Sequence, residues 1–347
     1  MKTNGEYRIG ILADDLTSAA DGAAPFVARG QNAVIGRRWL PLIDRTVVAV
    51  NSGSRSVTAP QAAKRVASFA ARLASRDVLY KTVDSTLRGN VTAELEASFH
   101  VSQRKMLVFT PAFPAAGRTT VRGVQLVDGI PVSETVYGRD PVHPARVSRL
   151  IDLVPSSIGN VVILDAETQD ELDAKIEALP EPESILWVGS PGMAAALARR
   201  LAPVGRPCGP ISAGGGDVLV AIGSANPRSH RQADRIANQH GVTLLRAPLE
   251  RHDDPSTVLR QIAQDAVERL RGGQFDTLIA TGGDTMEAIL DRLGIQAFDI
   301  LQEIEAGFPL GRAALDDGRM LQIAMKAGGF GDDDALRRAI AWASAWR

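Results

Sequence analysis

The sequence predicts an α/β protein of two domains, each with a mostly parallel sheet flanked by helices. Its 347 residues correspond to about two domains of average size. Short apolar runs alternate with longer Ala-rich segments, which is the pattern of βαβ units and parallel sheets. A segment rich in Pro and Gly interrupts this alternation and is typical of a linker. We therefore expect domains at 1–202 and 217–347, joined by a linker at 203–216.

The expected strands are short apolar runs that recur along the whole chain. In the first domain they are Arg8–Ala13, Thr46–Val50, Val78–Lys81, Met106–Thr110, Val161–Asp165 and Ile185–Val188. In the second domain they are Val218–Ile222, Val242–Arg246 and Thr277–Ala280, and an apolar run follows over Met320–Met325. The expected helices include Ala59–Ala74, Pro191–Leu201 and Met286–Leu293. Connections of this length leave room for a helix between successive parallel strands.

Composition excludes several classes of protein. The chain has 39 Lys and Arg against 40 Asp and Glu, so no basic surplus is present to neutralise a nucleic-acid backbone. The single cysteine, Cys208, excludes an internal disulfide framework and cysteine-based zinc sites. No apolar run approaches the roughly 18 residues of a membrane span, and the N-terminus lacks an apolar signal core. We expect a cytoplasmic protein that binds neither nucleic acid nor membranes.

Polar residues follow four of the expected strands in the first domain. Ligands of open α/β sheets bind outside the carboxyl ends of the strands, so these residues are candidates for a binding site. They are Asp14, Asp15, Ser54, Arg55, Lys81, Asp84, Arg88 and Arg118. Alternatively, Asp15, Ser52, Ser85 and Thr119 simply cap helices. Caps alone do not explain the four cations, so we favour a site for a small polar ligand.

Glycine-rich turns follow the expected strands of the second domain. They lie at Gly223–Asn226, at Gly282–Thr285 and at Lys326–Gly331. Such turns expose backbone N–H groups that can bind a phosphate, and glycine lets the phosphate approach closely. Neither the P-loop pattern nor the Rossmann fingerprint opens a helix after a strand. A dehydrogenase or a Walker-type ATPase is therefore disfavoured.

Several segments resemble the signature segments of the four-carbon acid sugar kinase family. They are Ala13–Asp21 (ADDLTSAAD), Lys81–Asn90 (KTVDSTLRGN), Pro111–Thr120 (PAFPAAGRTT), Val188–Gly192, Gly223–Gln232, Gly282–Thr285 and Lys326–Gly331. The resemblance implies an acid-sugar domain at 1–202, an ATP domain at 217–347 and an active site in the cleft between them. It also implies an ATP-dependent kinase that phosphorylates the terminal hydroxyl of threonate, erythronate or 3-oxo-tetronate.

The resemblance carries the ATP contacts of the family onto particular residues of this chain. They are Ser224, Asn226, Gly282, Gly283, Asp284, Thr285 and Gly328. Asn226 stands where a serine is usual, and Ala327 and Gly329 replace the Ser and Asn of the last loop. These departures keep open a binding or sensor protein of the same fold that has lost catalysis. A further alternative, from the Gly282–Thr285 turn alone, is a phosphofructokinase-like or NAD-kinase-like enzyme with another substrate.

Phosphoryl transfer needs a positioned phosphate, neutralised charge and an oriented hydroxyl. Mg²⁺, held by phosphate oxygens and one or two carboxylates, would neutralise charge, and the sequence leaves its ligands open. The acid's carboxylate would bind among Arg55, Lys81, Arg88 and Arg118, with Asp14 and Ser54 nearby. Asp15 and Asp84 are the joint candidates for accepting the proton, although Asp84 could instead form a structural ion pair with its neighbouring cations. The expected partners are the acid sugar and ATP, and the sequence allows a homodimer.

Overall fold

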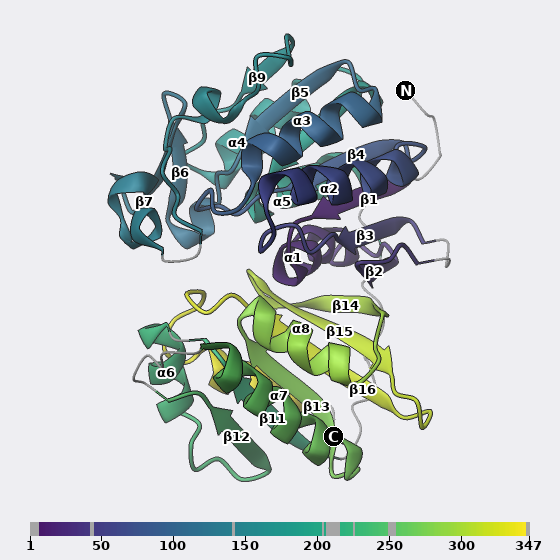
Figure 1. Cartoon of the computed structure of the whole chain (residues 1–347), viewed down its shortest axis with the longest axis vertical. Helices are drawn as coiled ribbons and strands as arrows, with labels where there is room; N and C mark the ends of the chain where they lie inside the picture. Colours follow the sequence, from purple (N-terminus) through teal and green to yellow (C-terminus); the bar gives the residue numbers. More distant parts are fainter. Residues whose placement is uncertain are drawn as a thin grey trace. The chain divides into compact units, whose positions relative to one another are not determined.

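The computed structural model of the chain describes residues 7–41, 45–140, 143–202, 205, 216–224, 226–248 and 255–344 (Figure 1). The chain divides into two compact units, Met1–Arg206 and Pro207–Arg347. The expected α/β class is confirmed, because strands alternate with helices in both units. Most of the expected linker at 203–216, with Cys208, lies outside the described residues, so the linker stays a prediction.

A parallel sheet with the strand order β2-β3-β1-β4-β10-β5-β9 forms the centre of the first unit. Every neighbouring pair of these strands is parallel. The strands are β1 (Ile9–Ala13), β2 (Ala33–Arg37), β3 (Val47–Asn51), β4 (Val78–Thr82), β5 (Met106–Thr110), β9 (Val161–Ile163) and β10 (Ile185–Gly189). The expected strands of this unit are confirmed with small shifts at their ends, whereas the sequence pattern did not predict β2.

Helices cover both faces of this sheet (Figure 1). α1 (Leu16–Val27), α4 (Gln169–Glu177) and α5 (Pro191–Leu201) lie on one face, and α2 (Ala59–Leu73) and α3 (Val91–Ser102) lie on the other. In α2 the buried residues recur every three or four positions, at Ala62, Val66, Ala70 and Leu73. This spacing gives the helix one apolar side, which packs on the sheet.

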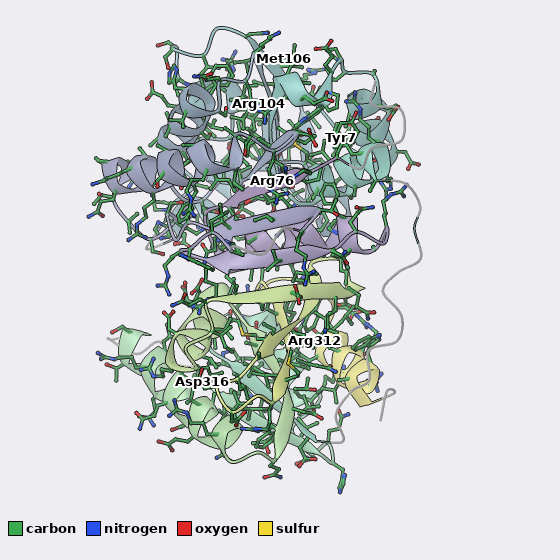
Figure 2. All side chains as sticks on the ribbon, turned by 90° about the vertical axis from the view of Figure 1, so that its right-hand side faces the viewer. Tyr7, Arg76, Arg104, Met106, Arg312 and Asp316 are labelled. Atoms are coloured by element: carbon green, nitrogen blue, oxygen red, sulfur yellow. The ribbon has the colours of Figure 1, made fainter. Side chains whose placement is uncertain are left out.

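Two arginines lie at the amino-terminal edge of this sheet (Figure 2). Nη1 of Arg76 donates to the carbonyls of Arg45 and Thr46 at 3.0 and 3.1 Å. Nη2 of Arg104 donates to the carbonyls of Ala74 and Arg76 at 3.2 and 2.8 Å. These bonds tie together the loops that enter the strands, at the edge opposite to the candidate site residues.

A small antiparallel sheet, β6-β7-β8, follows β5 in the chain. Its strands are β6 (Arg118–Val121), β7 (Val124–Val127) and β8 (Ile130–Pro131), and the 3₁₀ turns of the unit are η1 (Pro114–Ala116), η2 (Val132–Glu134), η3 (Val136–Arg139), η4 (Leu150–Leu153) and η5 (Pro182–Ser184). We call residues 114–139 the antiparallel lobe. The sequence predicted no strand here, because strands of two to four residues are too short to show a periodic pattern.

The second unit contains a mixed sheet with the order β12-β11-β13-β16-β15-β14. The strands are β11 (Asp217–Ile222), β12 (Val242–Arg246), β13 (Phe275–Thr281), β14 (Ala297–Glu305), β15 (Phe308–Ala314) and β16 (Met320–Lys326), and the helices are α6 (Pro227–Asp234), α7 (Pro255–Arg271), α8 (Gly283–Arg292) and α9 (Ala335–Ser344). β11, β12, β13 and β16 pair in parallel, whereas β14 and β15 are antiparallel. Among the described residues, no helix has the length and apolar composition needed to cross a membrane.

Both sheets have a point at which the chain reverses its direction of travel across the strands. In the first unit, β1 is followed by β2 and β3 on one side and then by β4 on the other. In the second unit, β11 lies between β12 and β13. Open α/β sheets bind ligands at the carboxyl ends of the strands beside such a switch point. The candidate polar residues and the glycine turns follow these strands.

Candidate active site

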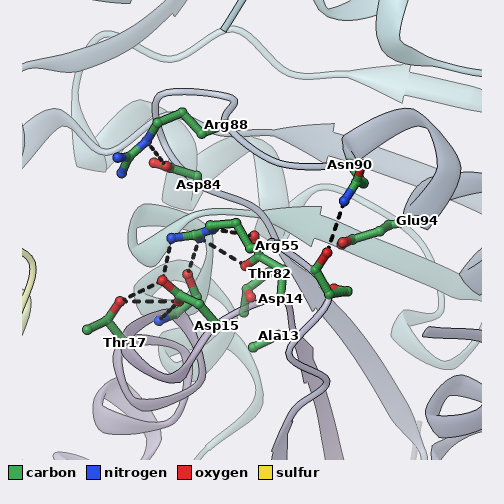
Figure 3. A network of polar contacts seen from close by, with 12 residues as sticks. Ala13, Asp14, Asp15, Thr17, Arg55, Thr82, Asp84, Arg88, Asn90 and Glu94 are labelled. Carbon is green, nitrogen blue, oxygen red and sulfur yellow. Dashed lines mark hydrogen bonds and ion pairs between the residues drawn. The ribbon is translucent and has the colours of Figure 1, made fainter. Parts of the chain in front are cut away.

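Arg55 joins the ends of two neighbouring strands of the first unit (Figure 3). It follows β3, and its guanidinium group contacts Asp14 and Asp15, which follow β1. Nε and Nη2 of Arg55 bind the two carboxylate oxygens of Asp14 at 2.7 and 3.0 Å, which is a bidentate geometry. Although burial lowers the pKa of Arg55, the charges of Asp14, Asp15 and Asp84 raise it well above its ordinary value.

Asp15 has two roles in the structure. It is the N-cap of α1, because its carboxylate accepts a hydrogen bond from the Ser18 N–H at 2.7 Å. It also contacts Nη1 of Arg55 and accepts a hydrogen bond from the Thr17 hydroxyl at 3.0 Å. Burial raises the pKa of Asp15, with help from the charge of Asp14 and against that of Arg55. Asp15 is therefore a stronger base than an ordinary aspartate.

Asp84 lies in the loop after β4 and binds Arg88, as one of the two sequence interpretations predicts. Nε of Arg88 lies 2.5 Å from the Asp84 carboxylate, whose other oxygen accepts bonds from the N–H and hydroxyl of Thr86 at 3.0 and 2.9 Å. Burial opposes ionisation, but the charges of Arg88 and Arg55 and the Thr86 N–H together lower the pKa of Asp84 below its ordinary value. Asp84 is therefore ionised at neutral pH.

Lys81 is fully buried and forms an ion pair with Glu94 of α3. Its Nζ lies 2.7 Å from the Glu94 carboxylate and donates to the Thr82 carbonyl at 2.5 Å. Burial raises the pKa of Glu94, and the ammonium of Lys81 opposes this shift. Ser54 is also fully buried, with its hydroxyl 2.9 Å from that of Ser52. Lys81 and Ser54 thus lie beneath the strand ends, and their expected contact with substrate stays a prediction.

Arg118 opens β6 and meets Arg88 at a tyrosine of the antiparallel lobe. The Cζ atoms of Arg88 and Arg118 lie 5.5 and 5.6 Å from the centroid of the Tyr137 ring. Nη2 of Arg118 also donates to the Tyr137 hydroxyl at 2.9 Å. Two of the predicted cations are therefore neighbours in space, although 29 residues separate them in the chain.

The capping alternative holds for Asp15 but not for the other residues that it included. The Ser52 hydroxyl donates to the Ala13 carbonyl at 2.7 Å and so ties the end of β3 to the end of β1. Thr119 lies in β6 rather than at a helix start. Sequence reasoning missed Glu94 and Tyr137. For Glu94 a signal was present, since it shares a helical face with the buried residues Leu95 and Ser98.

The three glycine loops of the second unit converge at the ends of β11, β13 and β16. A methyl group on Gly223 would lie 2.1 Å from Oγ1 of Thr285, and one on Gly328 would lie 2.1 Å from Oγ of Ser224. Gly282 adopts a φ of +92°, which is strained for residues other than glycine, and its N–H donates to the Lys326 carbonyl at 2.9 Å. Because these loops lie so close to one another, Gly223, Ser224, Gly282, Thr285 and Gly328 form a cradle lined by backbone and hydroxyl groups.

Helices begin at two of these loops, as the phosphate-binding interpretation requires. Asn226 is the N-cap of α6 and accepts a bond from the Arg228 N–H at 2.9 Å. α8 starts at Gly283, so its first turn contains the exposed Asp284 and the buried Thr285. Free N–H groups and the positive end of the helix dipole favour an anion at such positions. The expected ATP residues are thus close together, and their contact with nucleotide stays a prediction.

The third loop is held by side chains from α6 and by its own lysine. Ser229 and Arg228 donate to the carbonyls of Gly328 and Gly329 at 2.8 and 2.9 Å. Nζ of Lys326 lies 3.1 to 3.4 Å from the carbonyls of Ala327, Gly328 and Phe330. Burial lowers the pKa of Lys326 to about 8.

Within the described part of the chain, no three His, Cys, Asp or Glu side chains gather into a metal-binding group. In the first unit the carboxylates of Asp14, Asp15 and Asp84 all contact arginine. A Mg²⁺ ion that arrives with a nucleotide needs only one or two carboxylates, because phosphate oxygens and water complete its shell. The residues present fit an ion of that kind rather than a preformed all-protein metal site.

Comparison with known proteins gives matches in both units. A sugar-binding N-terminal domain family matches residues 9–160, and a nucleotide-binding C-terminal domain family matches residues 250–336. The chain is 31% identical to a D-threonate kinase of Bordetella bronchiseptica, over 96% of this chain and 97% of the relative. It is 28% identical to a 3-oxo-tetronate kinase of Methylobacterium radiotolerans, over 96% and 98% of the two chains.

Solved structures support the fold. A Salmonella typhimurium protein that is 21% identical has a TM-score of 0.77 and covers 95% of this chain and 98% of its own. A Bordetella bronchiseptica protein that is 29% identical, with a TM-score of 0.51 over 97% and 98% of the two chains, is a domain-swapped dimer with bound citrate. With the sequence identity to the D-threonate kinase over nearly the whole chain, these findings show that the chain belongs to the four-carbon acid sugar kinase family.

Proposed function

We propose that this protein transfers the γ-phosphoryl group of ATP to the terminal hydroxyl of threonate, erythronate or 3-oxo-tetronate. The observation that carries this proposal is the convergence of the loops at Gly223, Gly282 and Gly328 at the switch point of the second unit. Among the described residues, backbone groups, the hydroxyls of Ser224 and Thr285 and the side chain of Asn226 lie at this cradle, and such groups can bind a phosphate chain. The relatives over nearly the full chain are kinases of four-carbon acids.

The residues of the second unit would bind and position ATP. The N–H groups at the start of α8 and the hydroxyls of Ser224 and Thr285 can donate to phosphate oxygens. Ala327 and Gly329 depart from the usual last loop, but the contacts of this loop with α6 use the carbonyls of Gly328 and Gly329. These contacts do not need the missing side chains. This favours an active kinase over a sensor that has lost catalysis.

A Mg²⁺ ion bound with the nucleotide would supply positive charge to offset the negative charge that develops during transfer. In the second unit, the carboxylate of Asp284 is exposed at the start of α8, where it would share such an ion with the nucleotide. One carboxylate suffices for an ion held mainly by the nucleotide.

Asp15 and Asp84 remain the joint candidates for orienting the attacking hydroxyl. The transition state of phosphoryl transfer is loose, so a weakly basic carboxylate that accepts a hydrogen bond is sufficient. Asp84 fits this role because its pKa is low and it is ionised at neutral pH. Asp15 is the stronger base, because burial raises its pKa. Asn substitutions at the two positions distinguish them, since only the residue that contacts the hydroxyl should lower kcat with little change in the KM for ATP.

A coupled ADP-release assay over a panel of acceptors tests the proposal. Threonate, erythronate and 3-oxo-tetronate should be turned over, threitol should be turned over only slowly, and fructose 6-phosphate and NAD should not be turned over. Turnover of fructose 6-phosphate or NAD in place of the acids would overturn the substrate assignment. Binding of ATP without turnover of any acceptor would support the sensor alternative. Because the Bordetella bronchiseptica neighbour is a dimer, light scattering on the full chain tests our further proposal that this protein also forms a homodimer.

A further inference from the structure

The four cations of the predicted substrate site differ in whether a carboxylate already neutralises them. Arg55 contacts Asp14 and Asp15, Lys81 contacts Glu94, and Arg88 contacts Asp84. Arg118 forms no ion pair with any carboxylate among the described residues, because its Nη1 and Nη2 contact neutral oxygens and its guanidinium group lies against the Tyr137 ring. Of these four cations, Arg118 is therefore the one whose positive charge is available to the carboxylate of an incoming acid.

Arg118 is buried in a way that is unfavourable without an anion. Its exposed fraction is 9%, and its Nε has no hydrogen-bond partner within the described residues. Its Nη1 contacts the Ala116 carbonyl and its Nη2 donates to the Tyr137 hydroxyl. Neutral acceptors satisfy two nitrogens but leave the positive charge uncompensated, and a buried charge without a partner is strongly destabilising. A bound carboxylate would supply the missing charge and an acceptor for Nε.

Tyr137 places a second cation and a hydroxyl donor beside Arg118. Its ring lies beneath the guanidinium groups of both Arg88 and Arg118, and such contacts attract cations to the ring face. Its hydroxyl oxygen accepts from Arg118, and no described residue accepts a bond from the phenol hydrogen. That hydrogen is available to an anion that binds both arginines.

Arg88 connects this group to the rest of the site. Its Nε donates to Asp84, its Nη1 lies 3.8 Å from Asp140, and no described residue accepts a hydrogen bond from Nη1 or Nη2. Arg88 therefore has donors left for a ligand while its Nε fixes its position. Asp84 in turn interacts with Arg55, so the polar residues run from Arg118 to the end of β1.

We propose that Arg118, Tyr137 and Arg88 form the subsite for the carboxylate of the substrate, with the phenol of Tyr137 donating a hydrogen bond to it. Lys81 and Arg55 organise the strand ends instead. The carbon chain of the acid then extends from the antiparallel lobe towards Asp84 and Asp15, which places its far hydroxyl near the candidate proton acceptors. The identity of the ligand as a four-carbon acid rests on the proposed function, whereas the anion subsite rests on the contacts of Arg118.

Kinetics of three variants against threonate and neutral threitol test the subsite. Arg118→Met should raise the KM for threonate by about 10–150-fold, the effect of losing a charge-assisted hydrogen bond. Tyr137→Phe keeps the ring and should raise it by about 10-fold. Both variants should turn over threitol slowly, at a rate within about twofold of the wild type. Threitol has no carboxylate, so it makes no contact that these substitutions could remove. Arg139→Met is the matched control, since Arg139 is an exposed arginine of the same lobe, and its KM should match the wild type.

The subsite can still be tested if one of these variants folds poorly. Tyr137→Phe removes one oxygen atom, so it carries the test if Arg118→Met does not fold. An unchanged KM for threonate in Tyr137→Phe would overturn the role of the phenol, and an unchanged KM in a folded Arg118→Met would overturn the subsite.

Calorimetry separates failure of the subsite from failure of the proposed function. If the wild type releases no ADP with any four-carbon acid, the proposed function fails. Threonate should still bind the wild type in the absence of nucleotide, and Arg118→Met should weaken that binding by about 10-fold or more. Equal binding of threonate to the wild type and to Arg118→Met, or no binding to either, would overturn the subsite.

Discussion

Gly328→Ala tests the nucleotide cradle at its tightest approach. The added methyl group would lie 2.1 Å from Oγ and 2.9 Å from Cβ of Ser224, and 3.3 Å from Cβ of Asn226. Contacts under 3.0 Å do not occur between real atoms of this kind, so Ser224 or the loop after β16 must move. Rotation of the Ser224 side chain is not enough, because its Cβ is also too close. We therefore expect the loop to shift.

The size of the effect follows from two terms of opposite sign. Overpacking of this kind lowers the free energy of unfolding by about 1–3 kcal/mol. Replacing glycine by alanine raises it by about 0.4–1 kcal/mol, because the unfolded chain has less conformational entropy. The free energy of unfolding should fall by no more than about 2.5 kcal/mol. ATP binding should suffer more, because a displaced loop loses one or two hydrogen bonds to phosphate, each worth about 1.5–3 kcal/mol, or about 10–150-fold in Kd.

Isothermal titration with ATP and urea unfolding measure both quantities on the full chain. Gly159→Ala is the matched control, since nothing lies within 4 Å of a methyl group there and its backbone conformation suits alanine. It should bind ATP as the wild type does. Threonate binding to the first unit should be unaffected by Gly328→Ala. An ATP Kd within about twofold of the wild type in a folded Gly328→Ala protein would refute the assignment of this loop to nucleotide binding.

Three further predictions concern buried charges. The pKa of Asp84 lies below its ordinary value of 3.8, so its ionised form stabilises the fold above that pH and this stability is lost as the pH falls further. Asp84→Asn should therefore flatten the loss of unfolding free energy below about pH 4, and an equally steep loss in urea titrations of the variant would contradict this. Glu94→Gln should lower the free energy of unfolding by about 3–5 kcal/mol, because it leaves Lys81 buried without a counterion. The double variant Lys81→Met with Glu94→Leu should lose much less stability and keep the KM for threonate. A raised KM in the double variant would instead support contact of Lys81 with substrate. Because the pKa of Lys326 is lowered to about 8, its charge is present below that pH and lost above it. Nζ of Lys326 holds the third glycine loop through three carbonyls, so loss of its charge should loosen that loop. ATP affinity should therefore fall above pH 8 by at most about tenfold per pH unit. Lys326→Met should bind ATP weakly at every pH and should not show that fall.

The sequence predicts the strands with long apolar runs well but not the short or mixed ones. Met106–Thr110 and Val242–Arg246 have the expected bounds. β2 and the hairpin of β14 and β15 were not predicted. In β2 the apolar run is interrupted by Gly36 and Arg37, although all of the strand is buried. In β14 and β15 charged residues break the apolar pattern, and pairing with neighbouring strands decides the structure.

The sequence identifies candidate site residues more readily than it assigns a role to each of them. Strand ends placed Arg55, Lys81, Arg88 and Arg118 in one region, because all parallel strands present their carboxyl ends at one edge. Which of the four is free to bind an anion depends on partners such as Glu94 of α3. A glutamate in a helix is normally solvated, and although Glu94 shares a helical face with Leu95 and Ser98, that pattern does not identify Lys81 as its partner. Long-range pairings of this kind are set by packing rather than by local sequence.

The position of β10 has a consequence for synthesis on the ribosome. β10 (Ile185–Gly189) lies between β4 and β5, although it follows both of them in the chain. Until it emerges, β4 and β5 each have an open edge, and the two halves of the first sheet have no strand between them. Open strand edges bind other chains, which makes such nascent forms prone to aggregation. A fragment that ends at residue 160, where the sugar-binding family match ends, should therefore require a chaperone or precipitate, whereas one that extends through α5 should be recoverable.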